Sequence, residues 1–72
     1  MMPVVFIEPR PKGDPEGSPI KDYSVETSAS NVLSTFATQQ GAIDWAKEQG
    51  YTPLIAHVRR TQKGNRDHWQ RV

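Results

Sequence analysis

The stretch TQQGAIDWAKEQGY, residues 38–51, decides the fold because it contains one amphipathic helix together with its start and stop signals. The hydroxyl of Thr38 can accept a hydrogen bond from the first free amides of the helix. Gly50 suits the left-handed conformation that ends a helix, and Tyr51 can fold back onto the last turn. The residues on or near one face, at 3.6-residue spacing, are Ala42, Ile43, Trp45, Ala46 and Gln49. A helix of about three turns is marginal alone, so we expect it to pack on a sheet.

Three strands are predicted before this helix. Residues 4–8 form a short run rich in β-branched and aromatic side chains, bounded by prolines. Residues 21–27 alternate, which indicates a strand with one wet face. Its inner side would carry Tyr23, Val25 and Thr27, and its wet side Asp22, Ser24 and Glu26. Residues 28–31 read as a turn, so residues 32–36 should complete an antiparallel hairpin.

The remaining segments are one strand, one loop and an undecided end. Residues 53–60 alternate as a fourth strand after the helix. Residues 68–72 are either a fifth strand or a flexible tail. Residues 9–19 hold four of the six prolines and two of the five glycines, which predicts a mobile loop. This loop is either a binding loop or a surface insertion, and the latter is favoured because long loops cost little entropy.

The predicted order β-β-β-α-β, with or without a final β, indicates the α+β class. We expect an antiparallel sheet of three to five strands with the helix packed on one face. With 72 residues, the chain is expected to be a single domain, 1–72, with a thin core.

The helix and the following strand carry a resemblance. Residues 34–46 (STFATQQGAIDWA), with Gly50 and the run LIAHV at 54–58, resemble a family of short bacterial domains of unknown function. The similarity covers roughly the second half of the chain. It implies an antiparallel sheet, one helix and a closing strand, and it implies no activity.

Composition narrows the classes of function. The chain has no cysteine, which excludes disulfides, thiolate metal sites and cysteine nucleophiles and favours a reducing compartment. No stretch approaches the roughly 20 apolar residues of a membrane span, and residues 1–8 lack the features of a signal peptide. We therefore expect a soluble, cytoplasmic domain with no membrane partner.

Charge is distributed unevenly along the chain. Four basic and seven acidic residues precede Arg59, a net charge of −3, whereas residues 59–72 hold five basic and one acidic residue, a net charge of +4. Arginine binds phosphate or carboxylate in bidentate geometry, and tryptophan can stack on a base. The candidate interaction surface is Arg59, Arg60, Lys63, Arg66, His68, Trp69 and Arg71.

This basic end admits three interpretations. Trp69 can cover an open sheet face while the arginines keep an edge strand soluble. The basic end can instead bind a protein partner or a second copy of the chain, or it can bind nucleic acid weakly. The pI of about 8.1 is below the level above roughly 9 that is usual for nucleic-acid domains. An interaction domain that binds a protein or itself is therefore the favoured function, and weak nucleic-acid binding is the alternative.

Catalytic, cofactor and metal sites are not expected. His57 and His68 lack a nucleophile motif, and with Asp67 they match no metal-ligand spacing. The glycine-rich run at 13–18 lacks the Gly-Lys-Ser/Thr ending of a phosphate loop. Asp22 and Glu26 share one strand face and are expected to be solvated. The sequence thus predicts a protein that is not an enzyme.

Overall fold

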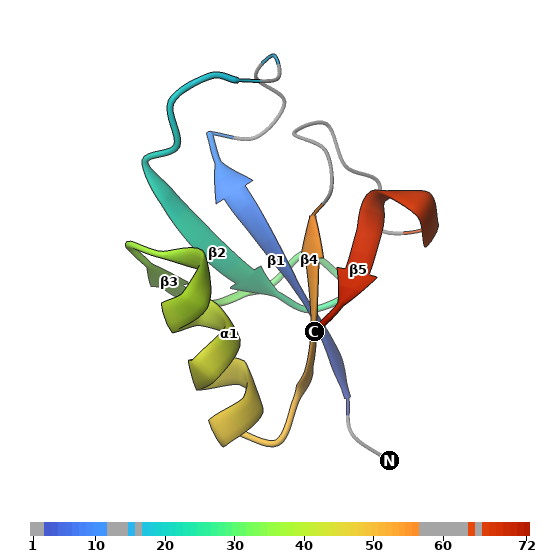
Figure 1. Cartoon of the computed structure of the whole chain (residues 1–72). Helices are drawn as coiled ribbons and strands as arrows, with labels where there is room; N and C mark the ends of the chain where they lie inside the picture. Colours follow the sequence, from blue (N-terminus) through green and yellow to red (C-terminus); the bar gives the residue numbers. More distant parts are fainter. Residues whose placement is uncertain (1–2, 12–14, 16, 57–63, 65) are drawn as a thin grey trace.

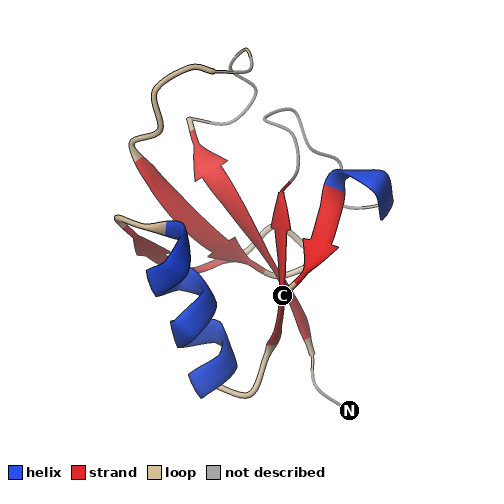
Figure 2. Ribbon diagram, in the orientation of Figure 1, coloured by secondary structure: helices blue, strands red, loops and turns tan. Residues whose placement is uncertain are grey.

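The computed structural model describes residues 3–11, 15, 17–56, 64 and 66–72. They form a five-stranded sheet in the order β3-β2-β1-β4-β5, with one α-helix packed on one face (Figures 1 and 2). The α+β class and the helix-on-sheet arrangement are therefore confirmed, and the end of the chain is a fifth strand. The elements are β1 (Val4–Arg10), β2 (Asp22–Glu26), β3 (Val32–Phe36), α1 (Gln39–Glu48), β4 (Thr52–Ala56), the short 3-10 helix η1 (Arg66–His68) and β5 (Trp69–Arg71).

The sheet is mixed, and this differs from the expected antiparallel sheet at one pair of strands. β2 pairs antiparallel with β1 and β3, and β5 pairs antiparallel with β4, but β1 and β4 run parallel. The helix explains the difference. It carries the chain from the outer strand β3 across one face to the middle of the sheet (Figure 1). This crossover lets the chain enter β4 in the same direction as β1, which a parallel pair of strands requires.

Both ends of α1 form as predicted. The Thr38 Oγ1 accepts a hydrogen bond from the Gly41 amide at 3.1 Å. At the other end Gly50 has φ of +85°. The amides of Gly50 and Tyr51 donate to the carbonyls of Lys47 and Ala46 at 3.1 and 2.8 Å. These two bonds are the Schellman pattern, so the local sequence defines both boundaries of the helix.

The main core lies between the sheet and the helix. It comprises Val5, Ile7, Val25, Ala42, Ile43 and Ala46. Trp45 is half-buried beside this core, with its ring centroid 5.7 Å from Phe36 and 6.0 Å from Tyr51. Gln49, expected on the buried face, is exposed because it is the C-cap of the helix, where the chain turns away.

β1 is longer than predicted, because Pro9 and Arg10 continue the strand. They pair with Tyr23 and Asp22 of β2. Proline is tolerated in a strand where it removes no ladder hydrogen bond. Among the described residues β1 pairs with β4 only as far as Ile7, so Pro9 interrupts no described ladder on that side. The rest of the predicted loop is described only at positions 11, 15 and 17–19, and the predicted strand end at 57–60 lies outside the described residues.

Candidate functional site

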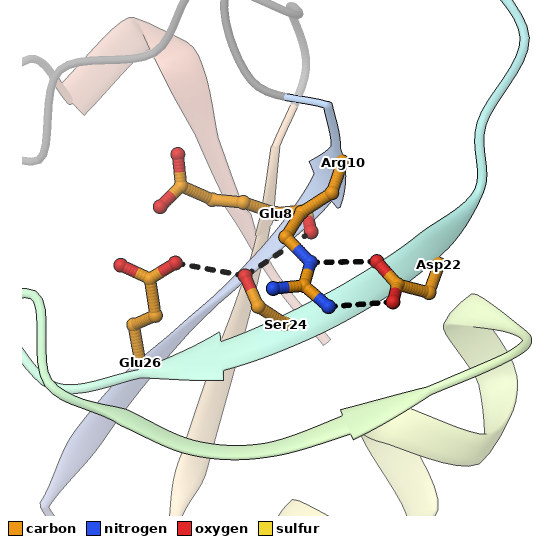
Figure 3. Close-up of polar contacts among 5 residues, drawn as sticks. All are labelled: Glu8, Arg10, Asp22, Ser24 and Glu26. Carbon is orange, nitrogen blue, oxygen red and sulfur yellow. Dashed lines mark hydrogen bonds and ion pairs between the residues drawn. The ribbon is translucent and has the colours of Figure 1, made fainter.

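The sheet face opposite α1 carries a buried polar cluster. Side chains alternate along a strand, so this face receives Glu8 from β1 and Ser24 and Glu26 from β2 (Figure 3). Their exposed fractions are 4%, 0% and 1%. The expectation that Ser24 and Glu26 lie on a wet, solvated face is therefore wrong, since alternation identifies the face of a side chain but not whether that face is covered.

Ser24 is at the centre of this cluster. Its Oγ donates to the Glu26 Oε2 at 2.8 Å, and it lies 3.5 Å from the backbone carbonyl oxygen of Glu8. A buried carboxylate is tolerated only when hydrogen bonds replace its lost hydration. The serine hydroxyl supplies one such bond, so the cluster links neighbouring strands through polar contacts inside a small protein.

Arg10 and Asp22 extend the cluster along the two strands, to the last residue of β1 and the first residue of β2. The Arg10 Nε donates to the Asp22 Oδ1 at 2.6 Å and the Arg10 Nη2 to Oδ2 at 2.5 Å (Figure 3). This bidentate bond lowers the pKa of Asp22 and raises that of Arg10; desolvation opposes both shifts, and coulombic attraction adds to them. Both side chains are more exposed than the glutamates, at 39% and 22% for Arg10 and Asp22, so solvent screens the pair.

The predicted aromatic anchor, Trp69, also lies on this face. Its ring meets Phe6 edge-on, with centroids 4.8 Å apart and an interplanar angle of 73°. Trp69 is only 9% exposed. Its ring therefore packs within the protein, and a stacked base would need that packing to open.

The other residues of the predicted basic surface are placed only in part. His68 is half-buried at the end of η1, and Arg71 is exposed on β5. Arg66 lies in η1, while Arg59, Arg60 and Lys63 lie outside the described residues. The gathering of positive charge at this end of the chain stays a prediction. In the part of the chain that the structure describes, no group of three or more histidine or acidic side chains is suited to a metal ion.

A second surface, the outer edge of β3, was not singled out from the sequence. β3 is the last strand on one side of the sheet and contains neither charge nor proline. Val32 and Leu33 are 52% and 40% exposed, and Thr35 is exposed beside them. Outer strands are usually protected by charge or proline. We call this surface, Val32–Phe36, the β3 edge.

The missing charge extends beyond the strand. No Asp, Glu, Lys, Arg or His occurs in the 17 residues from Thr27 to Ile43, although charged residues make up 24% of the chain. This uncharged run is the feature of the sequence from which the β3 edge could have been predicted. β5 differs, because it has only three residues and includes Arg71.

One irregularity affects the β3 edge. Val25 pairs with Ser34 and Glu26 pairs with Val32, so Leu33 is an extra residue in the register. Such a bulge bends a strand and is itself a common protection of edges. Residues 34–36 keep regular pairing with β2, so the accessible straight part of the β3 edge is short.

Comparisons with protein-family models, with curated proteins and with solved structures gave no match. Among the described residues, no helix has the length and apolar character required to cross a membrane.

Proposed function

We propose that this chain is a protein-binding domain, and that its partner adds a strand to the β3 edge. In this mode of recognition, main-chain hydrogen bonds supply affinity and alternate side chains supply specificity. The observation that carries the proposal is an outer strand, β3, with two exposed apolar side chains and no charge or proline.

The surroundings of β3 support this proposal because they hold the strand in place. β3 pairs with β2 at every residue except Leu33, and α1 lies against it. Behind the strand, Phe36 contacts Trp45 of the helix at 5.7 Å between ring centroids. A strand that is already ordered before binding loses less conformational entropy when a partner adds to it.

The alternative function, nucleic-acid binding through the basic C-terminal segment, has less support from the described residues. Its predicted stacking residue, Trp69, is packed on Phe6. A cytoplasmic location also remains a prediction, resting on the absence of cysteine.

The proposal is tested with a displayed library of random 12-residue peptides selected against the folded chain. We expect selected peptides to be rich in uncharged β-branched and aromatic residues. Their binding should shift the backbone amide resonances of residues 32–36. Thr35→Lys should abolish binding because it introduces a charge on the β3 edge.

The matched control is Ile20→Lys, which adds the same charge at another exposed position, 45% accessible and outside the strands. It should bind the selected peptides as the unaltered chain does. Selection of no peptide would overturn the proposal. Peptides whose resonance shifts lie only at residues 66–72 would also overturn it.

A further inference from the structure

We infer that the partner strand is β3 of a second copy of this chain, so that two molecules join edge to edge around a two-fold axis. This inference rests on the proposed function, because it names the occupant of the same edge. The two sheets would then continue into one another through antiparallel β3 pairing.

The charge pattern carries this inference. In a two-fold interface the same surface meets itself, so a charged residue near the axis faces its own copy. Like charges directly opposite each other in a sheet are destabilising. The 17 uncharged residues from Thr27 to Ile43 surround the β3 edge on both sides in sequence. Because these residues are uncharged, no such repulsion arises when two copies of the β3 edge meet. A partner recognised through its charge would instead require charged residues on this edge.

The residue types on the strand suit self-pairing. Val32, Thr35 and Phe36 are β-branched or aromatic, and pairs of such residues across antiparallel strands are favourable. Val32 and Leu33 are the exposed apolar residues of this edge, and a second copy would cover them in both molecules at once. The bulge at Leu33 confines regular pairing to a short stretch, so we expect a weak, reversible dimer.

The first test is the mass of the unaltered chain by sedimentation equilibrium from about 10 μM to 1 mM. We expect a monomer–dimer equilibrium. Its constant should change little between low and high salt, because the interface contains no charge. A mass that stays monomeric throughout this range would overturn the inference.

The second test uses paired charges at one exposed position. Thr35 is the middle residue of the regularly paired stretch 34–36, so the two-fold axis is expected to pass beside it. Thr35→Lys and Thr35→Glu should each be monomeric, because like charges then face each other across this axis. An equimolar mixture of the two variants should recover the dimer, since each lysine can face a glutamate. Ile20→Lys and Ile20→Glu are the matched controls, and each should dimerise as the unaltered chain does.

The outcomes separate this inference from the proposed function. If both Thr35 variants dimerise normally, the dimer uses another surface and the inference is wrong. If the chain is monomeric but selected peptides bind at residues 32–36, the partner is a different protein and only the self-association is wrong. If the dimer forms, and mixing the Thr35 variants fails to restore it, the two-fold β3 pairing is wrong.

Discussion

The two faces of the sheet are buried in different ways. On the face covered by α1, apolar side chains such as Ile7 and Val25 pack against Ile43 and the helix alanines. On the opposite face, Glu8, Ser24 and Glu26 are nearly as inaccessible, yet they are polar or charged (Figure 3). The first face gains stability from apolar burial, whereas the second must satisfy each buried polar group. A thin domain therefore depends on hydrogen bonds as well as on its apolar core.

A substitution in the apolar core on the helix-covered face should have the largest effect on the free energy of unfolding. Ile7 is 0% exposed at the centre of this core, and Ile7→Ala should lower the free energy of unfolding by about 2–5 kcal/mol. Urea denaturation measures this loss. If the alanine variant does not fold, Ile7→Val should still show a loss of about 0.5–1.5 kcal/mol. An unchanged midpoint for Ile7→Val would contradict the packing described.

Removing one hydrogen bond from the opposite face should have the next largest effect. Ser24→Ala leaves Glu26 without the 2.8 Å hydroxyl donor, and hydrogen bonds to charged groups contribute about 1.5–3 kcal/mol. Urea denaturation should show a loss in this range. Ser28→Ala, at an exposed turn position, is the control and should stay within about 0.5 kcal/mol. If Ser24→Ala lowers the free energy of unfolding no more than Ser28→Ala does, the hydrogen bond from Ser24 does not stabilise the fold.

The aromatic contact on the same face can be weakened without leaving a large cavity. Phe6→Leu keeps an apolar side chain opposite Trp69 but removes the edge-on ring contact. Such contacts contribute about 0.5–1.5 kcal/mol beyond burial, so we expect a loss of about 1 kcal/mol. The tryptophan fluorescence of the folded protein should change as well. An unaltered emission spectrum would contradict the contact.

The smallest effect is expected at the exposed end of the polar face, and it should depend on pH. Because the Arg10 hydrogen bond lowers the pKa of folded Asp22, this carboxylate stabilises the fold above its ordinary pKa of about 3.9. The contribution is lost as the pH falls through the lowered value. Asp22→Asn should therefore be less stable than the unaltered chain at pH 7, and this difference should shrink as the pH falls below about 4. A stability difference independent of pH would contradict the ion pair.

Local signals in the sequence predicted most of the fold. The Thr38 cap, the Gly50 terminator and the strand at 32–36 depend on short-range preferences, and all three are confirmed. The parallel pairing of β1 with β4 was not predicted, because it depends on where the crossover helix returns the chain. The continuation of β1 through Pro9 was missed for a similar reason, since it depends on which neighbours the strand has at that point.

The sequence was less informative about the site. Alternation placed Ser24 and Glu26 together on one side of the strand but could not show that this side is buried. The basic C-terminal segment indicated Trp69 as an available aromatic, whereas its contact with Phe6, which joins β5 to β1 across β4, depends on tertiary structure. The β3 edge could have been found from the uncharged run at 27–43, but only the strand order shows that β3 is outermost.

The two outer strands are unlike, and this limits the size of any assembly. Of the two outer strands that the structure describes, β3 has an uncharged edge, while β5 is short and carries Arg71. A molecule with two adhesive edges could stack into a fibril, as unprotected strands do in amyloid. In the dimer inferred above, pairing would occupy β3 of both molecules and leave β5 as the outer described strand at each end. Such an assembly would therefore stop at two molecules, because a closed two-fold pair uses the same surface of both copies.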